Sequence, residues 1–155
     1  MNECLAAPSR IKWDSRFLSM AKLVSGWSKD PSTKTGAVIV RPDRTILSVG
    51  FNGFPKQMED NPEVYANREE KYSRIVHCEI NALIHARQSV QGCTLYTYPF
   101  MCCDRCVVQM IQAGIGRFVC PKPSADALSR WADAIEKSKR YLYESNVTFT
   151  EYNFD

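Results

Sequence analysis

The amino-acid sequence predicts an α/β protein with a three-layer α/β/α architecture around a mixed five-stranded sheet. Two observations lead to this prediction. Short β-rich runs alternate with amphipathic stretches that are long enough to form helices. The last two predicted strands, residues 117–120 and 147–152, are separated by a long helical stretch over 125–145. A connection of that length indicates parallel strands, because a hairpin needs only a few residues.

The N-terminal part of the chain predicts a loose arm followed by a helix. Residues 1–12 show no periodicity and are interpreted as the arm. From an N-cap at Asp14 or Ser15, apolar residues recur at spacings of three and four, which is typical of an amphipathic helix. The residues predicted to form its buried side are Phe17, Met20, Ala21, Val24 and Trp27.

A hairpin and a charged segment are predicted next. Residues 36–40 and 46–51 are β-rich and flank a turn with Pro42 at its favoured second position, so they should pair antiparallel. Residues 63–71 predict one or two helical turns, and the simplest interpretation of their many charges is a solvated face.

The central part predicts a helix, a strand and a second helix. The helix that follows His77 should bury Ile80, Leu83 and Ile84, while His85, two turns beyond His77, is interpreted as a plain surface residue. Residues 94–97 form the third predicted strand, and residues 103–114 form a helix that ends near a glycine.

Composition limits the classes of protein to consider. The 155 residues suit one domain, and 45% hydrophobic with 24% charged residues is normal for a globular protein. We found no apolar run of membrane-spanning length and no signal-peptide pattern, so a cytoplasmic location is expected. A net charge of +3 is too small to indicate a nucleic-acid partner.

The cysteines indicate a metal site rather than disulfides. Their number, seven, is odd, and three of them cluster at positions 102, 103 and 106. Cys4, Cys93 and Cys120 have no partner spacing and are interpreted as small buried or incidental thiols.

A histidine followed by a cysteine pair provides the donors for that metal. His77, Cys103 and Cys106 can give Zn²⁺ three ligands and leave the fourth tetrahedral position for water, the layout of a catalytic zinc site. Glu79 lies two residues after His77 and can act on that water as a proton shuttle without being a ligand. The combination His-x-Glu with Cys-x-x-Cys is typical of zinc nucleobase deaminases.

Four blocks, in order, resemble the deoxycytidylate (dCMP) deaminase family of the cytidine deaminase superfamily. Besides the zinc motifs they include S-K-D-P-S-T-K-T-G-A-V over 28–38, G-F-N-G-F-P over 50–55, and Lys71 with Tyr72. The resemblance runs from about residue 17 to residue 149 and implies a cytidine-deaminase-like fold. Two positions depart from the family pattern: Cys78 replaces the usual alanine, and Cys102 the usual proline. Cys103 remains the predicted ligand, since only it is two residues from Cys106.

The resemblance implies zinc-dependent hydrolysis of dCMP to dUMP and ammonia, in pyrimidine deoxynucleotide metabolism. Glu79 would move the protons of this reaction. The implied cofactor is one catalytic Zn²⁺, and the implied substrate is a small deoxynucleotide.

Candidate substrate residues lie near these blocks. The family places the asparagine of the Gly-Phe-Asn-Gly stretch on the sugar, so Asn52 is expected at the deoxyribose 3′-hydroxyl; a turn residue is the alternative. Lys29, Ser32 and Lys34 lie in a loop that can approach the 5′-phosphate, unless these lysines are ordinary surface residues. Tyr98 and Phe100 can stack on the base or simply pack around Pro99.

Family members are commonly homo-oligomers, and many are activated by dCTP and inhibited by dTTP. Lys56 is the candidate effector-binding residue. The stretch after Pro55 lacks the glycine that regulated relatives often carry, which removes a place for close approach of a triphosphate.

Other functions were weighed against this one. A deaminase that acts on a base within nucleic acid, as tRNA-adenosine deaminases do, should show a basic or aromatic groove, and no such cluster is evident. A non-enzymatic zinc module would need Cys102 or Cys78 as a fourth ligand and would leave Glu79 unexplained. Free cytidine or another cytosine nucleotide is a closer alternative substrate.

Overall fold

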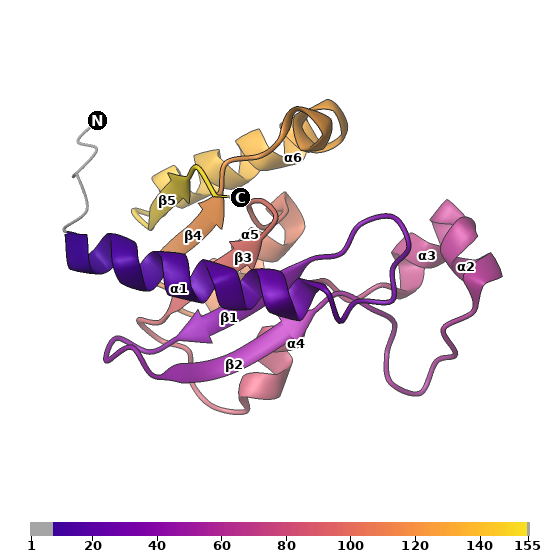
Figure 1. Cartoon of the computed structure of the whole chain (residues 1–155), viewed down its shortest axis with the longest axis horizontal. Helices are drawn as coiled ribbons and strands as arrows, with labels where there is room; N and C mark the ends of the chain where they lie inside the picture. Colours follow the sequence, from indigo (N-terminus) through magenta and orange to yellow (C-terminus); the bar gives the residue numbers. More distant parts are fainter. Residues whose placement is uncertain (1–7, 155) are drawn as a thin grey trace.

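The fold is built on a five-stranded sheet of strand order β2-β1-β3-β4-β5 (Figure 1). A computed structural model describes residues 8–154 of the chain. The strands are β1 (Gly36–Val40), β2 (Ile46–Phe51), β3 (Thr94–Tyr98), β4 (Arg117–Pro121) and β5 (Thr148–Tyr152).

The sheet is mixed, as predicted. β1 pairs antiparallel with β2 and with β3, whereas β3–β4 and β4–β5 are parallel. The hairpin of β1 and β2 and the parallel pair at the C-terminal end are therefore both confirmed. Parallel pairing also extends to β3 and β4, which are connected by a helix.

Helices cover both faces of the sheet, which gives the three layers. Along β1, Ala37 and Ile39 belong to one buried cluster and Val38 and Val40 to another, because successive side chains of a strand point to opposite faces. The second cluster is covered by α1 (Pro8–Ser25). The first cluster is covered by three helices: α4 (Cys78–Ala86), α5 (Asp104–Gln112) and α6 (Ala125–Glu144).

The predicted loose arm over residues 1–12 is wrong for its last part, because α1 begins at Pro8. Proline suits the first position of a helix, where its missing N–H has no intrahelical partner. The first turn of α1 is exposed, and Ile11 keeps 46% of its surface, so it has no buried stripe that a periodicity analysis could detect. Residues 1–7 lie outside the described residues.

Asp14 is not an N-cap. It lies within α1, is buried, and accepts hydrogen bonds from Arg117 (2.6 and 2.8 Å) and from the hydroxyls of Tyr96 and Tyr152 (both 2.6 Å). Burial raises the pKa of this carboxyl, but the hydrogen bonds from Arg117, Tyr152 and Tyr96 together lower it below the ordinary value. Asp14 thus ties α1 to β3, β4 and β5.

For three other side chains, the observed exposure differs from the predicted one. Trp27 lies beyond the end of α1 with 53% of its surface exposed, and Ile84 is 59% exposed on the outer side of α4. The charged segment forms α2 (Pro62–Ala66) and α3 (Arg68–Arg74), but Lys71 in α3 is buried rather than solvated. His85 is exposed, as predicted.

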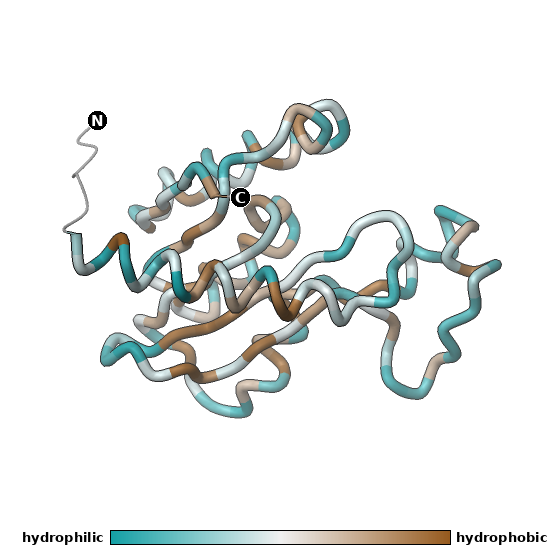
Figure 2. The backbone as a smooth tube through the Cα atoms, in the orientation of Figure 1, coloured by the Kyte–Doolittle hydropathy of each residue, from teal (hydrophilic) through white to brown (hydrophobic). Residues whose placement is uncertain are grey.

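Hydropathy follows this architecture. Figure 2 shows the hydrophobic segments concentrated in the central strands, while the part of the chain around α2 and α3 projects from the sheet and is mainly hydrophilic. Within residues 8–154, none of the helices combines the length and the apolar character needed to cross a membrane.

Candidate active site

His77 occupies the N-cap of α4. The preceding residue, Val76, is fixed by two backbone hydrogen bonds with Gly53 (2.8 and 3.1 Å), so the chain enters the helix at a defined point. An N-cap side chain usually accepts a hydrogen bond from the first turn, but the ring of His77 makes no such bond. Its imidazole is therefore available for another partner.

Cys103 occupies the corresponding N-cap position of α5. Its carbonyl accepts hydrogen bonds from the backbone N–H groups of Cys106 (3.1 Å) and Val107 (2.8 Å), which fixes the first turn. Its thiol makes no capping bond either. The N-cap residue and the third residue of a helix lie on the same side of its first turn. The sulfurs of Cys103 and Cys106 therefore lie on the same side of α5.

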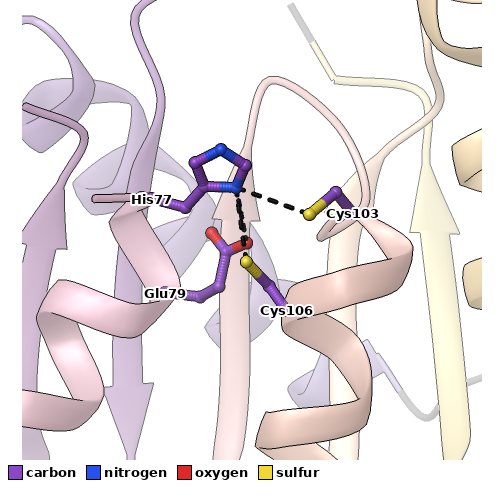
Figure 3. A group of neighbouring side chains, drawn as sticks. All are labelled: His77, Glu79, Cys103 and Cys106. Atoms are coloured by element: carbon purple, nitrogen blue, oxygen red, sulfur yellow. Dashed lines mark hydrogen bonds and ion pairs between the residues drawn. The ribbon is translucent and has the colours of Figure 1, made fainter. Parts of the chain in front are cut away.

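The two helix ends bring three donor atoms together (Figure 3). Nδ1 of His77 lies 3.4 Å from Sγ of Cys103 and 3.3 Å from Sγ of Cys106. With a carboxylate oxygen of Glu79 added, all four ligand atoms lie within 4.8 Å of one another. The predicted site residues of the zinc motif are thus in one place.

The spacing of these atoms fits zinc. Bonds of about 2.3 Å to sulfur and about 2.0–2.1 Å to nitrogen at a tetrahedral angle place the two ligand atoms about 3.5 Å apart. The observed 3.3 and 3.4 Å agree with this separation. Cys78 and Cys102 do not belong to the group of potential ligands, so no additional sulfur among the described residues closes the site.

Without a metal the two thiols favour the protonated form. Contact with Cys106, together with burial, raises the pKa of the Cys103 thiol, and contact with Cys102 raises the pKa of the Cys106 thiol. A divalent cation held between the sulfurs would favour their thiolate forms, so metal binding at this site would depend on pH.

Glu79 is buried, with 3% of its surface exposed, in the first turn of α4. The two cysteines that depart from the family pattern both contact its carboxylate: Sγ of Cys78 donates to Oε2 (2.8 Å) and Sγ of Cys102 to Oε1 (3.2 Å). Burial raises the pKa of both thiols, so they stay neutral donors. Their role could not be predicted from the sequence, since nothing in the spacing shows which way they point.

A pocket opens in front of this cluster. Its lining includes His77, Glu79 and Cys103, and it has aromatic side chains on several sides. The aromatic residues are Tyr72, Tyr98, Phe100 and Trp131. A planar heteroaromatic ring suits such walls. Tyr98 and Phe100, the residues predicted to stack on a base, both line the pocket, and Trp131, which comes from α6, lines it without having been predicted.

Asn52 also lines the pocket, and its amide holds the loop of residues 28–35. Oδ1 accepts from the backbone N–H of Thr35 (2.8 Å), and Nδ2 donates to the carbonyl of Thr33 (2.8 Å). Asn52 is 5% exposed. Nδ2 also donates to Oδ2 of Asp30 (3.4 Å), so the second lone pair of Oδ1 is the remaining capacity of this amide for a ligand.

A buried ion pair fixes the same loop from the other side. Nζ of Lys71 lies 2.7 Å from Oδ2 of Asp30 and donates to Ser32 Oγ (2.7 Å). Asp30 also accepts from the backbone N–H groups of Ser32 (2.9 Å) and Thr33 (3.3 Å). Burial raises the pKa of Asp30, but Lys71 and these N–H groups together lower it. Lys71 was not among the predicted site residues, because its place in a run of charges concealed its burial.

The remaining predicted residues do not line the pocket. Lys29 is paired with Asp60 (2.8 Å) and its side chain is 71% exposed. Ser32 is engaged by Asp30 and Lys71, and Lys34 and Lys56 are exposed.

Gly50 sets the distance between β2 and α4. A Cβ at this position would collide with the carbonyl oxygen of Cys78 and the amide nitrogen of Ala82. The absence of a side chain therefore allows α4, and with it Glu79, to lie directly on the sheet.

The fold and this cluster define a protein of the zinc-binding nucleobase or nucleotide deaminase class. The chain belongs to the cytidine and deoxycytidylate deaminase family: residues 11–122 match the family described as "Cytidine and deoxycytidylate deaminase zinc-binding region". This confirms the resemblance seen in the sequence.

Individual relatives agree with that assignment. An uncharacterized deaminase from the luxG 3′ region of Aliivibrio fischeri is 42% identical over 90% of this chain and 92% of its own length. Mouse deoxycytidylate deaminase is 33% identical over 72% of this chain and 66% of its own. The crystal structure of dCMP deaminase from the cyanophage S-TIM5 in complex with dCMP and dUMP has the same fold, with a TM-score of 0.69 at 22% identity, over 95% of this chain and 99% of that one.

Proposed function

We propose that this protein catalyses the hydrolytic deamination of dCMP to dUMP with release of ammonia, as a zinc enzyme. The observation that carries the proposal is the buried carboxylate of Glu79 beside three nitrogen and sulfur donors at the bottom of an aromatic pocket. A structural zinc site is closed by four protein ligands and does not need a carboxylate that acts on bound water. The names of relatives such as the mouse deoxycytidylate deaminase support the choice of substrate.

Zinc held by His77, Cys103 and Cys106 would supply a water nucleophile at neutral pH, since zinc lowers the pKa of water from about 15.7 to about 7. Glu79 accepts a proton from the attacking water and passes it to N3 of the pyrimidine. It then takes the remaining proton from the new C4 hydroxyl and delivers it to the amino group on C4. The C4–N bond breaks, ammonia leaves, and C4 becomes the carbonyl carbon of dUMP. The thiols of Cys78 and Cys102 hold the carboxylate in the orientation that these transfers need.

The pocket residues provide substrate recognition in this proposal. Tyr98 and Phe100 stack on the base, and Oδ1 of Asn52 accepts a hydrogen bond from the deoxyribose 3′-hydroxyl. The loop that carries Lys29, Ser32 and Lys34 lies next to the residues that line the pocket, so the 5′-phosphate is assigned to its side.

The family resemblance extends the proposal to the whole protein. It gives a role in pyrimidine deoxynucleotide metabolism, assembly into a homo-oligomer, and control by dCTP and dTTP, with Lys56 as a candidate contact for an effector phosphate. Light scattering of the zinc-loaded protein with and without each nucleotide measures the assembly.

A substrate panel tests the function. Zinc-loaded protein is incubated with dCMP, CMP, deoxycytidine, dCTP and a cytosine-containing oligonucleotide, and ammonia release is measured for each. The proposal predicts the highest kcat/KM for dCMP. Reaction with the oligonucleotide alone would show instead that the enzyme acts on a base in nucleic acid.

A further inference from the structure

We propose that Arg130 binds the 5′-phosphate of the nucleotide and makes the enzyme prefer a nucleotide over a nucleoside. This inference rests on the proposed function, because it assigns a specificity residue to the same pocket. It concerns a residue of α6, far in sequence from the zinc motifs and from the loop of residues 28–35.

The starting point is the charge of the pocket. Of the described residues that line it, Lys71 is the only lysine or arginine. Its ammonium is 2.7 Å from the buried carboxylate of Asp30, so its charge is already compensated. A phosphomonoester carries a charge of about −1.5 to −2 at neutral pH. The lining therefore lacks an uncompensated lysine or arginine for this group, and a cation at the rim would supply the missing positive charge.

Arg130 is placed at that rim by two contacts. Its Nη2 donates a hydrogen bond to Thr33 Oγ1 (3.3 Å), and its guanidinium lies 5.2 Å from the ring centre of Trp131. Thr33 and Trp131 both line the pocket, one from the loop and the other from α6. The contact thus joins two segments that border the pocket.

Thr33, which accepts the hydrogen bond from Arg130, is itself held by hydrogen bonds of its backbone. The backbone N–H of Thr33 donates to Asp30 (3.3 Å), and its carbonyl accepts from Asn52 (2.8 Å). Arg130 makes no ion pair with a carboxylate of residues 8–154, so its charge is available. Four of the five N–H donors of its guanidinium remain after the bond to Thr33, and their planar arrangement suits two phosphate oxygens.

The lysines of the loop are weaker candidates for this contact. Lys29 is already paired with Asp60. Lys34 lies between Thr33 and Thr35, both of which line the pocket, but Lys34 itself does not. Among residues 8–154, its exposed ammonium has no partner that would hold it at the rim.

The test compares dCMP with deoxycytidine, which differ only in the phosphate. Arg130→Gln should lower kcat/KM for dCMP by about 10- to 100-fold, mainly through KM, and should leave kcat/KM for deoxycytidine unchanged. Arg130→Lys should give an intermediate loss, because it keeps the charge but not the fork. Lys137→Gln is the matched control, because it removes one positive charge from an exposed ion pair of the same helix. It should leave kcat/KM unchanged for both dCMP and deoxycytidine.

Binding of the product provides a second measurement that does not depend on turnover. Calorimetry with zinc-loaded protein should show that Arg130→Gln weakens the binding of dUMP by about the same factor and leaves the binding of deoxyuridine unchanged. If Arg130→Gln leaves the dCMP to deoxycytidine ratio and dUMP binding at wild-type values, or if only Lys34→Gln lowers them, the assignment is wrong. If the wild-type protein releases no ammonia from dCMP, the proposed function itself fails, which is a different result.

Discussion

His77 and Cys103 occupy the same position, the N-cap, of two different helices, and Nδ1 of one lies 3.4 Å from Sγ of the other. Neither side chain caps its own helix. Both instead point into the space between the helix ends, where Cys106 adds a third donor. Residues of the type and spacing that bind zinc are thus held by backbone hydrogen bonds of helices that pack on the same face of the sheet.

The first prediction concerns the metal. Cys106→Ser should reduce bound zinc from about one ion per chain to less than about 0.1 after dialysis at neutral pH, because an alcohol does not replace a thiolate ligand. Metal content is measured by inductively coupled plasma mass spectrometry. Cys93→Ser, at a buried thiol outside the cluster, is the control and should keep its zinc. Full zinc occupancy in Cys106→Ser would contradict the assigned ligand set.

A second prediction concerns the packing of α4. Gly50→Ala should destabilise the protein by about 1–3 kcal/mol and lower kcat, since the new methyl group displaces the backbone of Cys78 and Ala82 and moves Glu79. Gly53→Ala is the matched control, because its Cβ would meet open space. Urea denaturation and steady-state kinetics of both variants provide the comparison. Equal kcat values in the two variants would show that α4 does not need its close approach to β2.

The ion pair between Lys71 and Asp30 gives a third prediction. Lys71→Met leaves a buried carboxylate without its partner and should cost about 3–5 kcal/mol of the free energy of unfolding. KM for dCMP should also rise, because Asp30 holds the loop that carries Thr33. Adding Asp30→Asn to Lys71→Met should recover part of the stability, since the charge is removed. A double variant that is less stable than Lys71→Met would argue against this explanation.

Asp14 gives a fourth prediction, on pH. Its pKa is lowered in the folded protein, so the unfolded chain takes up a proton more readily. The resulting stability is complete above the unfolded pKa of about 3.9 and is lost as the pH falls through the lower native value. Asp14→Asn should therefore be less stable at pH 7 and should lose less stability than the wild type between about pH 4 and pH 2. Urea titrations across this range measure the difference, and Asp133→Asn, whose side chain is 86% exposed, should retain the wild-type slope.

The sequence predicts those features that depend on local pattern. The hairpin follows from two β-rich runs around Pro42, and the parallel β4–β5 pair from the length of the helical connection between them. The candidate zinc ligands follow from the chemistry of histidine and cysteine at the right spacing, and the structure brings His77, Cys103 and Cys106 together.

Features that depend on long-range contacts could not be predicted in the same way. Asp14 is of a residue type that suits an N-cap, but its partner Arg117 is 103 residues away. In the sequence, Lys71 is one of several charged residues in a row. Only the structure shows that it pairs with Asp30, which is 41 residues away. Arg130 similarly depends on Thr33, 97 residues away, for its place at the rim of the pocket.

Glu79→Gln tests the central claim most directly. Glutamine has nearly the same size but cannot accept and return the proton, whereas His77, Cys103 and Cys106 are left intact. We expect about one zinc ion per chain, as in the wild type, and a kcat for ammonia release from dCMP that is lower by a factor of about 10³ or more. A Glu79→Gln variant that binds zinc fully and turns over dCMP at close to the wild-type rate would contradict the account.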